Sequence, residues 1–226
     1  MAVDRRLLLL ALAGLAGSIL LLWSNGSVSR ADASPAFTAE SYPVTVHGSA
    51  AKGIQKFNTE AGAIECEVAY HAETGEALAT LALSPTFSGC ESFKSSGFNF
   101  GGSFTTTGCK FQLESPVQTA EDKYQAGFGI ACEAGKAIQV VAATCELEIL
   151  PQSEAKAAEI VNDTSATPRK DITFKPELKS LPYKVTKDSF GCPFNGTGSK
   201  TGSFTTSAST TLTGTTPVPQ IGIDVG

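Results

Sequence analysis

Tryptophan, methionine and histidine are scarce in this 226-residue chain, and basic clusters are missing. The single Trp23 and the single Met1 both fall within the first 33 residues, and the only histidines are His47 and His71. Lysine and arginine number 17 against 22 acidic residues, which gives a formal net charge of −5 at pH 7. Proteins that bind nucleic acid neutralise phosphates with clustered lysine and arginine. The composition therefore excludes nucleic acid as a partner.

Motifs of metal centres and of common enzymes are missing as well. The chain has no C-x2-C pair of the kind that zinc sites use, and no G-x-S-x-G, H-E-x-x-H or phosphate-binding glycine loop. Residues 153–156 match S-x-x-K and residues 200–202 match K-T-G, a combination found in penicillin-recognising serine enzymes. Those enzymes place the serine on a helix inside a large α/β body, whereas this chain is rich in strand patterns. We therefore assign no catalytic residue, no metal ligand and no cofactor.

The first 33 residues have the pattern of an export signal. Arg5 and Arg6 precede an apolar run over residues 7–22, and small residues follow up to Ala31-Asp32-Ala33. This order predicts a secretory signal with an A-x-A cleavage site. Cleavage would leave 193 residues (226 minus 33) in an extracytoplasmic, secreted protein without membrane contact. The alternative is an uncleaved N-terminal anchor, in which case the protein fractionates with membranes and keeps the residues before Ser34.

Six cysteines follow the signal, and an even number in an exported protein indicates three disulfides. They are Cys66, Cys90, Cys109, Cys132, Cys145 and Cys192. Fifteen connectivities are possible. We predict Cys90 with Cys109, because both follow a glycine and they bracket a phenylalanine-rich segment. Cys145 with Cys192 would tie two halves of the chain together, and the remaining two cysteines form the third pair.

Alternation of apolar and polar residues predicts many short strands. Residues 64–71 are the clearest case, with Ile64, Cys66, Val68 and Tyr70 on one face of a half-buried strand. Residues 128–132 and 138–141 are expected to form a hairpin, because Gly135 and Lys136 set them apart. The further predicted strands are residues 42–47, 54–58, 77–83, 109–113, 145–149, 171–174, 183–186 and 203–212.

Two segments leave the choice of element open. Residues 153–161 resemble a short helix with Ser153 as its N-cap and several alanines, although a connection between β regions is the alternative. Residues 197–216 are nearly all Thr, Ser and Gly, for which we favour strands over a disordered stalk, with Ile221, Ile223 and Val225 as a closing edge strand.

The predicted fold class is all-β, an antiparallel sandwich or barrel-like sheet linked by disulfides. Residues 89–93 with 102–106 resemble residues 191–194 with 202–206, each carrying a Gly-Cys and then Gly-Ser-Phe-Thr-Thr. This weak repeat suggests two related halves, residues 34–150 and 151–226, and one continuous domain is the alternative.

Candidate binding residues come from two places. Glu65, Glu67, His71 and Glu73 share one face of the strand over residues 64–71 and its extension. Carboxylates beside a histidine suit a cation or acid–base chemistry, and the alternative is a solvated sheet face. Phe98 and Phe100 lie in a Gly- and Ser-rich segment and suit an aromatic platform for a glycan or a hydrophobic ligand, with burial in the core as the alternative.

The order of several short motifs resembles a group of uncharacterised exported proteins of high-GC Gram-positive bacteria. The motifs are Ile64-Glu65-Cys66, Ser84-Pro85-Thr86-Phe87-Ser88-Gly89-Cys90, Gly108-Cys109-Lys110-Phe111, Ile130-Ala131-Cys132, Thr144-Cys145-Glu146-Leu147 and Gly191-Cys192. The resemblance implies an all-β, cysteine-linked extracytoplasmic protein. It brings no catalytic or binding residues.

We expect a secreted, non-catalytic β domain that binds a cell-surface component, either a glycan or a protein. One alternative is an extracytoplasmic hydrolase that uses paired carboxylates, such as Glu65 and Glu67 with a partner from another strand. Two carboxylates roughly 5 to 10 Å apart in a deep cleft would favour the hydrolase, and glutamates on an open sheet face would speak against it. A membrane-anchored structural envelope protein is the other alternative.

Overall fold

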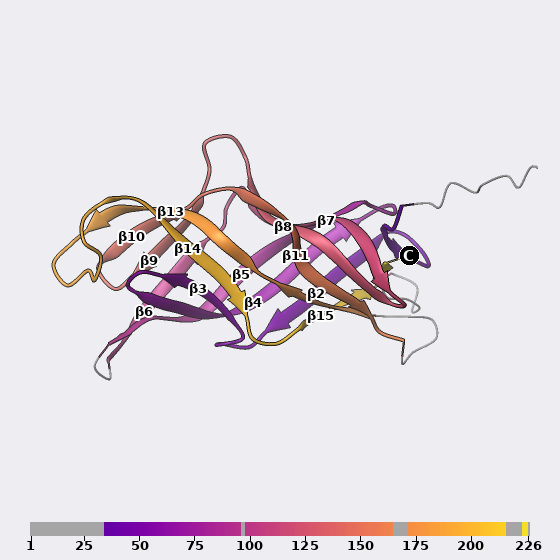
Figure 1. The fold of residues 1–226 in the computed structure, drawn as a ribbon, viewed down its shortest axis with the longest axis horizontal. Coiled ribbons are helices and arrows are strands. Elements are labelled where there is room, and N and C mark those ends of the chain that lie inside the picture. Colours follow the sequence, from indigo (N-terminus) through magenta and orange to yellow (C-terminus); the bar gives the residue numbers. More distant parts are fainter. Residues whose placement is uncertain (1–33, 96–97, 165–170, 216–222, 226) are drawn as a thin grey trace, which may run out of the picture. The chain divides into compact units, whose positions relative to one another are not determined.

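The computed structural model describes residues 34–95, 98–164, 171–215 and 223–225 (Figure 1). Residues Ser34–Gly226 form one compact unit. The described part consists of strands and their turns, contains no helix, and pairs its strands antiparallel throughout, which confirms the all-β, antiparallel prediction. Within it, no helix is long and apolar enough to cross a membrane. The expected export signal lies outside the described residues.

The sixteen strands of the described part follow one another along the chain with short connections. They are β1 (Phe37–Ala39), β2 (Val44–Ala50), β3 (Gln55–Thr59), β4 (Gly62–Thr74), β5 (Thr80–Ser95), β6 (Phe98–Thr105), β7 (Cys109–Ala120), β8 (Lys123–Cys132), β9 (Ile138–Ala142), β10 (Cys145–Ile149), β11 (Gln152–Asn162), β12 (Asp171–Pro176), β13 (Leu178–Asp188), β14 (Gly198–Thr206), β15 (Thr210–Thr215) and β16 (Ile223–Val225).

Fourteen of these strands close into a barrel, and one additional pairing divides it. The ring runs β10-β13-β14-β3-β4-β2-β15-β12-β11-β8-β7-β5-β6-β9 and returns to β10. Because β4 also pairs with β5, each side of that ladder forms a ring of eight strands. One ring holds β4, β5, β6, β9, β10, β13, β14 and β3, and the other holds β4, β5, β7, β8, β11, β12, β15 and β2. Figure 1 shows β4 and β5 between these two groups.

Two long strands serve both rings because their two ends pair with different neighbours. In β4, residues 62–65 pair with β3 and residues 68–74 pair with β2. In β5, residues 80–83 pair with β7 and residues 90–95 pair with β6. The alternation predicted for residues 64–71 places Ile64, Cys66, Val68 and Tyr70 in the core. The strands of both rings thus bury one face each around a common ladder.

Aromatic side chains fill the interior of the rings. Tyr70 packs edge-on against Phe174 with ring centroids 5.4 Å apart, and Phe57 packs edge-on against Tyr183 at the same separation. Phe111 contacts further core rings, among them Phe128 at 5.4 Å. Edge-to-face pairs at this spacing add to the stabilisation that burial alone provides. The core is therefore densely packed around rings contributed by strands far apart in the sequence.

The three disulfides connect neighbouring parts of the sheet, and one of the three predicted pairs is confirmed. Cys145 is bonded to Cys192, as predicted. The other two predicted pairs are wrong, because the structure bonds Cys66 to Cys90, joining β4 to β5, and Cys109 to Cys132, joining β7 to β8. Cys109 and Cys132 lie directly opposite in register. Both of these disulfides follow from which strands pair with each other. The glycines that precede Cys90 and Cys109 do not indicate that pairing.

Residues 153–161 form neither the short helix nor the connection between β regions that the sequence left open, because this segment lies within strand β11. Ala158 and Ile160 are buried, and β11 pairs with β8 on one side and β12 on the other. A bulge between Glu154 and Ala158 contains Lys156 at φ 58°. Alanine has the highest helix propensity, but the differences in propensity amount to less than about 1 kcal/mol per residue for most residue types, so strand pairing on both sides and burial prevail over that preference.

Further expectations on the strands have mixed outcomes. The hairpin of residues 128–132 with 138–141 is wrong, since β8 pairs with β7 and β11 whereas β9 pairs with β6 and β10. The Thr-rich segment does form strands, β14 and β15, but these pair with other strands and not with each other. Residues 223–225 pair with β1, and Ile221 lies outside the described residues. Strands from residues 151–226 enter the ring in two groups, β13 with β14 and β15 with β12 and β11, and strands from residues 34–150 lie between these groups.

Close approach of two backbones requires a glycine in β8, and this generates a stability prediction. A Cβ at Gly129 would lie 2.5 Å from the carbonyl oxygen of Gln152, whereas a Cβ at Gly101 would meet nothing within 4 Å. We expect Gly129→Ala to lower the free energy of unfolding by about 1 to 3 kcal/mol, because β8 and β11 must separate. Gly101→Ala is the matched control and should stay within about 0.5 kcal/mol of the wild type.

Urea unfolding of the oxidised proteins measures both values. An unchanged Gly129→Ala midpoint would contradict the register of β8 against β11.

Candidate binding surface

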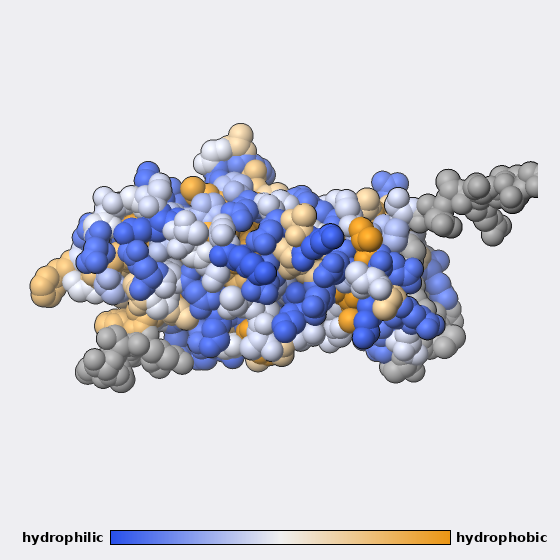
Figure 2. Space-filling model, viewed as in Figure 1, coloured by the Kyte–Doolittle hydropathy of each residue, from blue (hydrophilic) through white to orange (hydrophobic). Residues whose placement is uncertain are grey.

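The polar residues expected to share a face do lie together on the outward side of β4. Glu65 is partly buried, and Glu67, His71 and Glu73 are exposed, while the alternate residues Cys66, Val68, Tyr70 and Ala72 point into the core. Hydrophilic residues dominate the side of the molecule drawn in Figure 2, and hydrophobic ones form separate small patches there. The strand therefore presents its carboxylates on an open sheet face. Neither Glu65 nor Glu67 lines any of the three cavities described below, although the hydrolase alternative requires a deep cleft.

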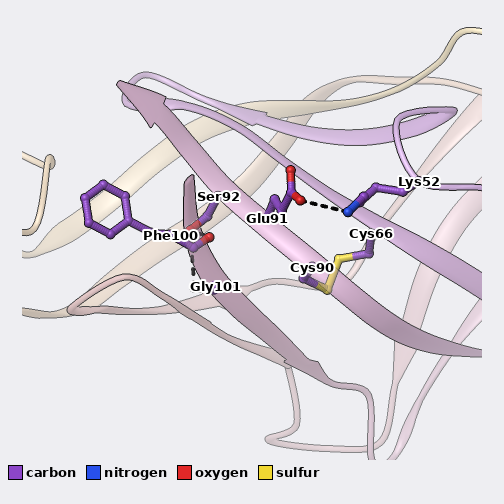
Figure 3. The surroundings of a disulfide bond; sticks show 7 residues. All are labelled: Lys52, Cys66, Cys90, Glu91, Ser92, Phe100 and Gly101. Carbon is purple, nitrogen blue, oxygen red and sulfur yellow. Dashed lines mark hydrogen bonds and ion pairs between the residues drawn. A yellow bond between two sulfur atoms is a disulfide. The ribbon is translucent and has the colours of Figure 1, made fainter. Parts of the chain in front are cut away.

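Lysines neutralise the glutamates at one end of this face. Glu65 forms an ion pair with Lys56 at 2.7 Å, and Glu91, which is its cross-strand neighbour on β5, forms one with Lys52 at 2.8 Å. Like charges on directly opposite residues destabilise a sheet, and the two lysines offset that repulsion. The hydrogen bond to Glu91 raises the pKa of Lys52, and Glu67 and Glu65 add to this effect. Figure 3 shows this ion pair above the Cys66–Cys90 disulfide.

At the other end, the two histidines of the chain lie opposite each other. His47 on β2 is in register with His71 on β4, and both are exposed. The same row continues to Thr213 on β15 and to Ser84 on β5. The sequence showed His47 only as the end of a strand pattern, because register between β2 and β4 is a property of the folded sheet.

A groove of about 540 Å³ opens beside this row, on the outer side of β5, β7 and β8. It forms where β5 leaves β7 after Leu83 and joins β6 at Cys90. The turn before β7 contributes Thr106 and Gly108 to the lining, and the Thr106 hydroxyl donates a hydrogen bond to the Pro85 carbonyl at 2.9 Å. The polar side chains that line the groove are Ser84, Thr86, Thr106, Lys110, Gln112 and Glu133. None of these groove residues was singled out as a candidate from the sequence.

The bulge of β11 forms a second hollow, of about 390 Å³. Charges of both signs line it, from Glu154, Lys156, Glu159, Lys175, Glu177 and Lys179. One Glu154 carboxylate oxygen accepts a hydrogen bond from the Lys179 backbone N–H at 3.1 Å. The sequence did not indicate this hollow, because residues 153–161 resemble a short helix and their pattern does not predict a bulge in a strand.

The interior offers no room for a ligand at its main apolar cavity. That cavity has a volume of about 20 Å³ and is lined mainly by phenylalanine and aliphatic side chains. Such a volume matches one water molecule, and an apolar lining leaves it dry. Any ligand larger than a water molecule must therefore bind elsewhere than in this cavity.

A buried polar chain crosses the core near this cavity. The Tyr70 hydroxyl donates to Gln55 Oε1, and Gln55 Nε2 donates to the Thr210 hydroxyl at 3.1 Å. Burial raises the pKa of Tyr70 strongly, because an ionised phenolate would lose its hydration, and the hydrogen bond that Tyr70 donates to Gln55 offsets only part of this rise. Burial also raises the pKa of Tyr183. The hydrogen bonds of Tyr70, Gln55 and Thr210 connect strands β4, β3 and β15 inside the core.

Of the two phenylalanines expected to form an aromatic platform, Phe100 is the one whose side chain the structure describes. The Phe100 side chain is 42% exposed, and Figure 3 shows its ring pointing away from the neighbouring strands. Phe93 is buried, and Phe104 stacks on Phe87 with ring centroids 4.6 Å apart. The Phe98 side chain lies outside the described residues. Among the aromatic side chains that the structure describes here, Phe100 alone is turned outward.

Neither a metal cluster nor a relative identifies the protein. In the part of the chain that the structure describes, no group of three or more His, Cys, Asp or Glu residues is placed to hold a metal ion. Comparison of the chain with protein-family models, with curated proteins and with solved structures returns no match. The functional argument therefore rests on the surface itself.

The buried Tyr70 predicts a loss of stability in alkali. Its pKa is raised in the folded protein above the ordinary value of 10.0, so between these values the folded state holds a proton that the unfolded state has lost. The free energy of unfolding should then fall as the pH rises above about 10. Tyr70→Phe should show a shallower fall, and at pH 8 it should be less stable by about 1 to 3 kcal/mol because Gln55 Oε1 loses its donor.

Urea unfolding at pH 8 and pH 11 measures both effects. Equal pH dependence in the two proteins would contradict the buried position of Tyr70.

Proposed function

We propose that the protein is a secreted, non-catalytic binding domain that holds a cell-surface glycan in the groove over β5, β7 and β8. The observation that carries the proposal is the lining of that groove. Hydroxyls, an amide, one lysine and one carboxylate converge there on a volume of about 540 Å³. Sugars present many hydroxyls that both donate and accept hydrogen bonds, so a lining of this kind suits them.

Several observations favour a glycan over a protein partner. The core of a protein–protein interface is enriched in aromatic residues and methionine. The large hydrophobic residues that the structure describes as exposed are Phe100, Val117, Val141, Val161 and Phe190, and none of them lines the groove. The groove is also open, so a polymer can pass along it.

Export is part of the proposal. Three disulfides close without leaving a free cysteine, as expected of a protein that works in an oxidising compartment. The export signal expected over residues 1–33 and the resemblance to exported proteins of high-GC Gram-positive bacteria favour a wall or surface polysaccharide as the ligand. The hydrolase alternative is disfavoured, because Glu65 is neutralised by Lys56 on an open face.

Binding of soluble oligosaccharides to the oxidised protein tests the proposal. The probes are neutral hexose, N-acetylhexosamine and uronic acid oligomers, and binding is followed by nuclear magnetic resonance shifts of the backbone amides. We expect shifts centred on residues 84–86 and 106–112 for at least one class. Thr86→Trp, which fills the groove, should weaken binding by about tenfold, equivalent to 1.4 kcal/mol.

Thr211→Trp is the matched control. Thr211 is also an exposed threonine in the middle of a strand, but it lies on β15 away from the groove, so this variant should bind like the wild type. No binding by any class, or equal binding by Thr86→Trp, would overturn the proposal. Release of new reducing ends during the experiment would establish the hydrolase instead.

A further inference from the structure

The two histidines of this chain form a cross-strand pair on the outer face of the sheet. The sequence of 226 residues contains only His47 and His71, which lie 24 positions apart. Folding places them in register across β2 and β4, both exposed on the same face. Directly opposite residues of an antiparallel pair have Cβ atoms about 4.5 to 5.5 Å apart. Two imidazoles at that spacing can turn toward one ion between them.

The surroundings of the pair suit a cation. The residues next to it in the row are Thr213 and Ser84, which are uncharged hydroxyl residues. Two residues along β4, Glu73 adds a negative charge on the same face. Lys110 lies one strand beyond Ser84, on β7, and Asp171 lies one strand beyond Thr213, on β12. The positions that adjoin both imidazoles therefore carry no lysine or arginine.

The disulfides leave no cysteine thiolate to compete with the imidazoles for a metal ion. All six cysteines are bonded to one another, so no thiolate is left to take a transition metal from the imidazoles. Imidazole favours copper, zinc and nickel over calcium or magnesium, and copper(II) binds most strongly in this series. Two protein ligands leave the other coordination positions to water, in agreement with the lack of any three-residue cluster among the described residues.

We propose that His47 and His71 form a two-imidazole site for a divalent transition metal ion on the outer face of the sheet. The site is independent of glycan binding in the groove. Because the site is assembled by the register of β2 and β4, it exists only in the folded chain.

Copper(II) binding by the oxidised protein tests this inference. Isothermal titration should give one tight site per chain at pH 7.5, and electron paramagnetic resonance should show coupling to two imidazole nitrogens. His47→Gln and His71→Gln should each weaken binding by about tenfold or more. Circular dichroism of each variant verifies that the strands remain folded.

The matched control keeps two histidines but separates them. In His47→Gln/Thr211→His, the new imidazole stands on β15, two strands away from His71 and out of register with it. This variant should bind as weakly as His47→Gln alone. Wild-type affinity in the double variant, or no copper bound by the wild-type protein, would overturn the proposal. Oligosaccharide binding should be unchanged in all these variants, so failure of the metal site is distinguishable from failure of the glycan site.

Discussion

Pairing of β4 with β5 is the constraint on which the rest of this structure depends. A single ring of fourteen strands would enclose a lumen too wide for side chains to fill, whereas eight strands enclose a space that side chains just occupy. The β4–β5 ladder converts the wide ring into two rings of eight. The aromatic core and the small size of the apolar cavity, about 20 Å³, follow from that division. Cys66–Cys90 locks the ladder where its register shifts between Glu65 and Glu67.

Because side chains fill the interior, both proposed binding sites lie on the outer face of the sheet. Where the two rings meet, β5 exchanges β7 for β6, and the exchange leaves the outer groove lined by Ser84, Thr86 and Lys110. The same ladder places Ser84 opposite His71 on β4, while the pairing of β4 with β2 places His47 on the other side of His71. The groove therefore follows from the β4–β5 ladder, whereas the histidine pair also requires the separate register of β2 against β4.

Local pattern predicted the elements well and their neighbours poorly. Alternation over residues 64–71 identified β4, the inward direction of Cys66 and the outward direction of Glu65, Glu67 and His71, because side-chain direction in a strand is a property of the strand itself. The Cys66–Cys90 bond and the His47–His71 pair depend on which strands lie side by side and in what register. No residue near them encodes that information. Residues 153–161 show another limit of prediction from local sequence patterns. An alanine-rich strand that pairs with a neighbour on each side has a local sequence that resembles a helix.

Peptide mapping of the unreduced protein tests the central ladder most directly. Proteolysis without reduction, followed by mass spectrometry, reports which cysteines are joined. If β4 and β5 pair as described, the peptide containing Cys66 is linked to the peptide containing Cys90, and Cys109 is linked to Cys132. Recovery of Cys66 bonded to Cys132, or of Cys90 bonded to Cys109, would place β4 and β5 apart and contradict the division into two rings.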